Sequence, residues 1–183
     1  MMKVLTALAA YKVSKPKSMT PGRISTFNKK SPSSQEEYIG YTQGLNFIVG
    51  TALMHLHQQE ENTFWFMISL LCDHQFLQVF NFQKDGMFRV LCFQLEILIQ
   101  VYIPDLYKHF LDNKVPTDIY ASNWFITMFS NDLPFEMAPN VLDVYLLEGK
   151  KGLLRIALSL LLFMKNDLMF LNNDDLLVCM SQT

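Results

Sequence analysis

Long uninterrupted apolar runs are absent from this sequence of 183 residues, although half of its residues are hydrophobic. A membrane-spanning helix needs about 20 consecutive, mostly apolar residues. The two longest apolar stretches, 91–103 and 153–164, are broken by polar side chains such as Glu96 and Arg155. We therefore expect both stretches to form buried helices, and any association with a membrane to be peripheral at most.

Cysteine is scarce, and the short motifs that hold metals or nucleotides are absent. The three cysteines, Cys72, Cys92 and Cys179, are widely spaced and form no CxxC pair, which predicts reduced thiols in the cytosol. His55 and His57 point in different directions on a helix, so they make a poor metal pair. The sequence contains no Walker motif and no glycine-rich phosphate loop. We expect no metal site, no cofactor and no nucleotide bound by the chain itself.

Acidic side chains are absent from the first 35 residues, which carry seven Lys and Arg. Residues 36–183 carry eight Lys and Arg against seventeen Asp and Glu. The segment 12–37 is rich in Ser, Thr, Pro and basic residues, and this composition predicts a disordered insertion because it buries too little apolar surface. Contact of this segment with anionic lipid stays open. Its basic residues are not interleaved with aromatic ones, so we expect no nucleic acid partner.

From Tyr38 onward, apolar residues recur at the spacing of three and four residues that is typical of helices. No stretch alternates with a period of two, and no internal repeat is present. The sequence therefore predicts an all-α fold, arranged as a globular helical array. The expected helices are 1–11, 43–58, 63–74 (capped by Asn62), 87–102 (ended by Pro104), 105–112 (capped by Asp105), 117–129, 139–147 (Pro139 in its first turn, stopped by Gly149), 152–164 and a last helix from Asp174.

Several segments carry motifs in a fixed order along the chain. Residues 4–11 read VLTALAAY, 39–46 IGYTQGLN, 60–65 EENTFW, 124–134 WFITMFSNDLP and 143–158 DVYLLEGKKGLLRIAL. In this order and at these separations they resemble segments of the TBC domain, the helical module that activates Rab-type small GTPases. The corresponding family patterns are LxxVLxAY, YxQGMN, EExxFW, WFLTLF followed by LP, and WDxFLxEGxxxLFRIAL. The one tryptophan that this last pattern has before the aspartate is replaced by Leu142.

The resemblance implies a multi-helix TBC-type array and assigns a role to four residues. Gln43 would be a glutamine finger, a side chain that orients the attacking water in the active site of the GTPase. Tyr41 would contact the switch region of the GTPase, Gly44 would permit a sharp entry into the helix, and Asn46 would hold the loop by side-chain hydrogen bonds. The implied partner is a Rab-type small GTPase in its GTP-bound state. The implied role is GTPase activation in vesicle trafficking, in the cytoplasm and peripherally on endomembranes through that partner.

The family also uses a catalytic arginine, which its IxxDxxR motif carries upstream of the LxxVLxAY helix. No IxxDxxR occurs in this chain. The resemblance therefore implies a domain that is incomplete at its N-terminus, with one helix at 1–11, the insertion at 12–37 and the remainder of the domain at 38–183. We expect none of Arg23, Arg89 and Arg155 to replace the missing arginine finger, because the first lies in the insertion and the others within helices far along the chain.

Two other functions stay open at this point. One is a catalytically impaired TBC module that binds a GTPase as an interaction or scaffold protein. The other is an unrelated helical scaffold or membrane-associated protein. The order of the motifs argues against the second. A Gln43→Ala change separates GTPase activation from mere binding, since it should reduce stimulated hydrolysis and leave binding largely intact.

Overall fold

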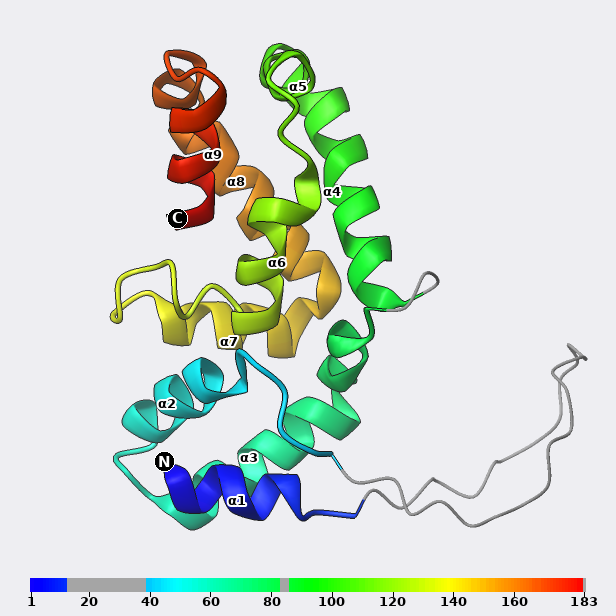
Figure 1. The fold of residues 1–183 in the computed structure, drawn as a ribbon. Helices are drawn as coiled ribbons and strands as arrows, with labels where there is room; N and C mark the ends of the chain where they lie inside the picture. The colour runs from blue at the N-terminus through cyan, green and yellow to red at the C-terminus, as the bar shows by residue number, and fades with distance from the viewer. Residues whose placement is uncertain (13–38, 83–85, 183) are drawn as a thin grey trace, which may run out of the picture.

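The computed structural model describes residues 1–12, 39–82 and 86–182, which form helices joined by short loops (Figure 1). No β-strand occurs among these residues, so the expected all-α fold is confirmed for them. The expected insertion lies outside the described residues from position 13 to its end. The elements are α1 (Met2–Ala9), α2 (Leu45–His55), α3 (Glu60–Ile68), η1 (Ser69–Asp73, a π-helical turn), η2 (Phe76–Phe80, a 3-10 helix), α4 (Met87–Tyr102), α5 (Pro104–Asp112), α6 (Thr117–Thr127), α7 (Ala138–Glu148), α8 (Lys150–Met169) and α9 (Asn173–Gln182).

Helix α6 lies in the middle of the fold and contacts helices from both of its parts. It contacts α4, α8 and α9 in the upper part of Figure 1, and α2 in the lower part. Its side chains Tyr120, Trp124 and Phe125 are fully buried, and the Trp124 ring centroid lies 5.2 Å from that of Tyr120. Burying one large apolar side chain stabilises the fold by about 1.5–3 kcal/mol. Because these side chains are packed in the core, α6 is held in place and can position a loop that contacts its end.

Prolines and glycines set several helix boundaries where the sequence predicts them. Helix α4 ends at Tyr102, and Pro104 both stops it and opens α5, because a proline in the first turn loses no helical hydrogen bond. Pro139 lies in the first turn of α7, and Gly149 follows its last residue with a φ of +63°. The predictions for α1, α4, α7 and the last helix are confirmed to within a few residues.

Two predicted helix caps are wrong. Helix α3 begins at Glu60, so Asn62 lies inside it, and the capping position belongs to Gln59. The acidic residues of its first turn favour this earlier start because they face the positive end of the helix dipole. Helix α5 begins at Pro104, which places Asp105 in the first turn, where it accepts a hydrogen bond of 3.1 Å from Lys165 instead of capping the helix.

Three helix lengths also differ from the prediction. Helix α2 is shorter than 43–58 because the backbone is left-handed at Gly44 before it and at His57 and Gln58 after it. Helix α6 stops at Thr127 because the next two residues have positive φ values. Helix α8 is longer than 152–164 at both ends, since it runs through Gly152 and continues to Met169.

Helices α7 and α8 approach closely at Gly152, and this contact yields a stability prediction. A β-carbon at Gly152 would lie 2.7 Å from Val144 Cγ1, whereas one at Gly50 inside α2 would have only the Met1 sulfur, at 3.8 Å. We expect Gly152→Ala to lower the free energy of unfolding by roughly 1–2 kcal/mol through overpacking. Gly50→Ala, the matched control, should raise it by up to about 1 kcal/mol. Urea unfolding measures both, and equal effects of the two changes would contradict the close packing.

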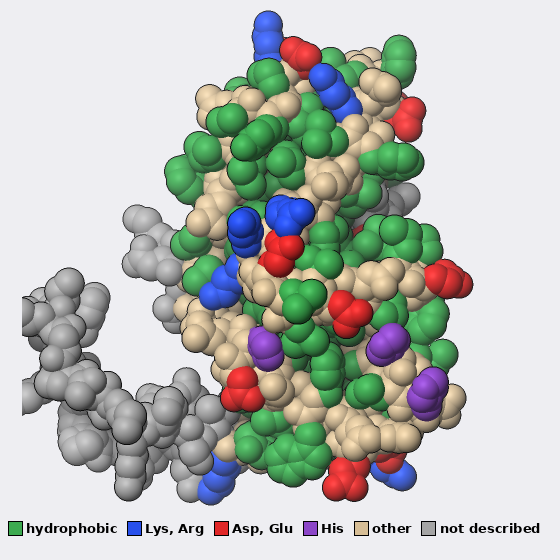
Figure 2. Space-filling model, turned by 180° about the vertical axis from the view of Figure 1, so that it is seen from behind, with side chains coloured by type: hydrophobic (Ala, Val, Ile, Leu, Met, Phe, Trp, Pro, Cys, Tyr) green, Lys and Arg blue, Asp and Glu red, His purple; other side chains and the backbone are tan. Residues whose placement is uncertain are grey.

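Large apolar side chains are exposed on the outer faces of α4 and α8. Phe93 and Val101 on α4 and Phe163 on α8 are more than half exposed. Figure 2 shows apolar side chains gathered over the upper part of the face that is seen from behind. Among the described residues no single helix is long and apolar enough to cross a membrane, and α4 and α5 reach that length only as a pair bent by 119°.

Candidate functional site

The four residues predicted for the site lie in one short loop and the first turn of α2. The loop leads from residue 39 to Gly44, whose φ of +98° and ψ of −26° turn the chain sharply into the helix. The backbone N–H of Leu45 donates to the Thr42 carbonyl at 3.2 Å, and that of Phe47 donates to the Gly44 carbonyl at 3.2 Å. A non-glycine residue rarely adopts such a φ, so this entry into α2 depends on Gly44.

The C-terminal turn of α6 presses against Gly44 from inside the fold. A β-carbon at Gly44 would lie 3.1 Å from the Ile126 carbonyl oxygen and 3.2 Å from Ile126 Cγ1. Two constraints therefore favour glycine at position 44: the positive φ of the backbone, and the lack of space for a β-carbon beside Ile126. The position of the loop is set by a helix that is about 80 residues away in the sequence.

The side chains on the outside of this loop are accessible to a partner. Gln43 is exposed, and within the described part of the chain its amide makes no hydrogen bond. Tyr41 is 60% exposed, and its hydroxyl donates to Asn46 Oδ1 at 3.5 Å, the upper limit for such a bond. The structure thus brings Tyr41, Gln43, Gly44 and Asn46 together, with the polar group of Gln43 free for an external ligand.

Sequence reasoning missed a polar cluster beside the site, at the end of α6. Asn123 Nδ2 donates to Asp132 Oδ1 at 2.6 Å, and Thr127 Oγ1 donates to the Asn123 carbonyl at 2.8 Å. The sequence places Asp132 within the family motif at 124–134, without a role for its side chain. The one available signal was the pair of amide and carboxylate residues at 131–132 before Pro134, which is typical of a turn with side-chain hydrogen bonds.

The ionisation of Asp132 is coupled to folding. Burial raises the pKa of its carboxyl from 3.8 to about 6, against the opposing hydrogen bonds from Asn123 and Asn131. Because the pKa is higher in the folded state, the stability that this group contributes is fully present below about pH 4 and is lost as the pH rises through about 6. The free energy of unfolding of Asp132→Asn minus that of the unchanged chain should therefore be larger at about pH 7 than at about pH 5. Urea unfolding at the two pH values tests this, and a difference that does not vary with pH would contradict it.

The two arginines within the described residues lie on α4 and α8, away in sequence from the loop and α2. Arg155 on α8 donates two hydrogen bonds, of 2.5 and 2.6 Å, to the Glu148 carboxylate at the end of α7. Arg89 on α4 lines a pocket that includes the first residues of α6, from Thr117. The Gly44 contact is at the last turn of the same helix, so Arg89 and the loop lie toward opposite ends of α6.

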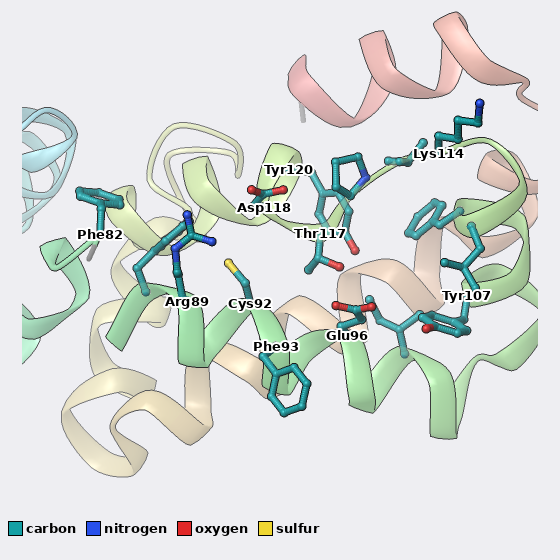
Figure 3. Close-up of a pocket in the computed structure, with 16 residues that line it drawn as sticks. Phe82, Arg89, Cys92, Phe93, Glu96, Tyr107, Lys114, Thr117, Asp118 and Tyr120 are labelled. Atoms are coloured by element: carbon teal, nitrogen blue, oxygen red, sulfur yellow. The ribbon is translucent and has the colours of Figure 1, made fainter. Parts of the chain in front are cut away.

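That pocket, of about 560 Å³, is the second candidate site (Figure 3). In Figure 3 the Cys92 thiol lies between Arg89 and Glu96 along α4, with Asp118 across from it on α6. Burial, with a smaller contribution from Asp118, raises the pKa of Cys92 to about 12, so the thiol stays protonated and is no nucleophile. No group of three or more His, Cys, Asp or Glu side chains in the described residues could hold a metal ion.

Comparison with known proteins assigns the fold and the loop to one group. The family model of the Rab-GTPase-TBC domain matches residues 30–169. The Ecotropic viral integration site 5 ortholog of Drosophila melanogaster is 36% identical over 160 residues, which cover 86% of this chain and 19% of that protein. The Rab GTPase-activating protein eat-17 of Caenorhabditis elegans is 34% identical over 149 residues, or 81% of this chain and 16% of that protein.

A solved structure agrees with these relatives. The crystal structure of the Chlamydomonas flagellar RabGAP TBC domain superimposes with a TM-score of 0.68 and 28% identity, over 78% of this chain and 47% of that chain. The chain thus spans about half of this solved domain and about a fifth or less of the length of the two curated relatives.

Proposed function

Because the chain belongs to the Rab-GTPase-TBC domain family, we propose that it is a GTPase-activating protein for a Rab-type small GTPase. Two relatives support this by name: the Rab GTPase-activating protein eat-17 and the GTPase activating protein Gyp51 of Schizosaccharomyces pombe. The chain binds the GTPase in its GTP-bound state. The chemistry takes place on the nucleotide that the GTPase holds.

The observation that carries this proposal is the exposed, unbonded amide of Gln43 on a loop with a fixed backbone. GTP hydrolysis by a small GTPase is slow because the attacking water is poorly held and the charge on the transferred phosphoryl group is incompletely stabilised. An amide provides a donor and an acceptor on one short planar group, so Gln43 can hold a water in line with the γ-phosphate. Ile126 lies close to Gly44 and holds the loop backbone in place. The amide of Gln43 is then positioned before the GTPase binds, which is what makes such a group effective.

Tyr41 and Asn46 complete the contact surface. Tyr41 is exposed on the same loop as Gln43, so its ring is accessible to the switch region of the GTPase, and its hydroxyl lies 3.5 Å from Asn46 Oδ1. Aromatic side chains of this kind give large contact areas for little loss of side-chain entropy. Through the GTPase, the chain acts in vesicle trafficking in the cytoplasm and at the surface of endomembranes.

One observation favours a second candidate, a module that binds the GTPase without strong activation. An arginine finger accelerates hydrolysis by about 10³ to 10⁵, but Arg155 is held by Glu148 and Arg89 lies toward the far end of α6. Neither of these two described arginines then adds to the stimulation that Gln43 supplies. Binding without any acceleration would identify this second candidate.

Binding to the two nucleotide states tests the proposal. We expect calorimetry to find at least about tenfold tighter binding to a Rab-type GTPase loaded with a non-hydrolysable GTP analogue than to the GDP form, a difference of about 1.4 kcal/mol. The two states differ at the switch region, which is the surface that Tyr41 is proposed to contact. Equal affinity for both states would contradict an activating function.

A further inference from the structure

The turn that follows α6, at 128–133, has an unusual backbone, and it lies next to the end of α6 that contacts the loop with Gln43. Met128 and Phe129, which directly follow α6, both lie in the left-handed region, with φ values of 50° and 58°. Two consecutive non-glycine residues in this region are strained and persist only where the surroundings hold them. This strained pair begins two residues after Ile126, whose backbone and side chain face Gly44.

Hydrogen bonds close this turn on both sides of the strained pair. Asn123 lies before it on α6 and Asp132 after it, and their side chains meet at 2.6 Å. The backbone N–H groups of Asp132 and Leu133 donate to the Phe129 carbonyl at 3.1 and 2.9 Å. The Asn123–Asp132 bond is therefore the side-chain link that folds the segment after α6 back against the helix.

We propose that Asp132 is a positioning residue for Gln43: its hydrogen bond to Asn123 fixes the last turn of α6 and, through the contact of Ile126 with Gly44, the loop that carries Gln43. This inference rests on the proposed function. In this role Asp132 acts through Asn123 and Ile126 and not by a contact of its own with the nucleotide.

The environment of Asp132 supports a role beyond stability. Its second carboxylate oxygen, Oδ2, is buried and has no hydrogen-bond partner among the described residues, and neither has the buried hydroxyl of Ser130. A desolvated carboxylate oxygen without a partner destabilises a fold, so an apolar or a neutral residue would serve stability alone better. What this side chain provides in return is an acceptor oxygen, 2.6 Å from Asn123 Nδ2, that holds Asn123 in one orientation.

A double-mutant cycle on stimulated GTP hydrolysis tests the inference. We expect Asp132→Ala to lower the maximal stimulated rate about tenfold while the affinity for the GTP-bound GTPase stays unchanged. The double change Asn123→Ala with Asp132→Ala should lower the rate no further than either single change, because each of them breaks the same hydrogen bond. Asp132→Asn retains an acceptor oxygen and should restore most of the rate. Asp167→Ala, a change of an exposed carboxylate on α8, is the matched control and should leave the rate unaltered.

The outcomes separate this inference from the proposed function. Three results would each overturn the positioning role: an unchanged rate in Asp132→Ala, a loss in the double variant that is the product of the Asn123→Ala and Asp132→Ala losses, or no rescue by Asp132→Asn. If Gln43→Ala itself has no effect, the glutamine finger fails and the positioning role fails with it. Should Asp132→Ala not fold, which circular dichroism shows, Asn123→Ala breaks the same hydrogen bond and must give the same loss of rate for the inference to hold.

Discussion

Replacing Gln43 with alanine is expected to lower the stimulated rate of GTP hydrolysis at least about tenfold, to near the intrinsic rate of the GTPase. Tenfold corresponds to about 1.4 kcal/mol of transition-state stabilisation. The loss follows from the removal of the amide that holds the attacking water, and loss of one preorganised polar group commonly has an effect of this size or larger. Single-turnover hydrolysis at saturating concentrations of the chain measures it. Because Gln43 is exposed and makes no hydrogen bond within the described residues, the melting temperature should not change.

Two controls make this result specific. Gln100 is an exposed glutamine near the end of α4, remote from the loop in sequence and in the fold, and Gln100→Ala should leave hydrolysis unaltered. Affinity for the GTP-bound GTPase should change by less than about threefold in Gln43→Ala. If Gln43→Ala binds the GTPase and stimulates hydrolysis as well as the unchanged chain does, Gln43 takes no part in the mechanism.

Substituting alanine for Gly44 is expected to have the second large effect, on both stability and activity. The new side chain must adopt a φ near +98° and must also displace Ile126, which would lie 3.1–3.2 Å from the β-carbon. We expect the free energy of unfolding to fall by roughly 2 kcal/mol or more. Any shift of the loop moves Gln43, and a displacement of about 1 Å can lower a catalysed rate by about 10². Urea unfolding and single-turnover hydrolysis of the same preparation measure the two effects.

Gly40 provides the matched control for this change. It lies in the same loop with a φ of +68°, but a β-carbon there would have no atom within 4 Å. Gly40→Ala should therefore show the backbone cost alone, about 1 kcal/mol, and a smaller loss of rate. If the two variants unfold at the same urea concentration, the contact between Ile126 and Gly44 does not position the loop.

Much of the fold could be predicted because its signals are local. Pro104, Pro139 and Gly149 mark helix ends through their own backbone constraints, and the structure has boundaries at or next to each of them. The family resemblance, drawn from ordered motifs, is confirmed by the match of the Rab-GTPase-TBC model to residues 30–169. Caps were predicted less well, since Asn62 and Asp105 compete with neighbours that begin the helix earlier.

The support of the site could not be predicted, because it depends on contacts between distant residues. Nothing in the loop 39–46 shows that Ile126 is its neighbour, and a bond between Asn123 and Asp132 requires a turn with two left-handed residues that are not glycines. Met128 and Phe129 have no local preference for that conformation. They adopt it because both side chains are fully buried in the core, and the packing overrides the backbone preference.

The most direct test of the central claim is single-turnover hydrolysis of GTP by a panel of Rab-type GTPases, each with and without the chain. We expect acceleration of at least one member by about tenfold or more, saturating with the concentration of the chain and lost in Gln43→Ala. A panel in which some members bind the chain in the GTP-bound state but none hydrolyses faster would contradict activation and leave the binding module as the function.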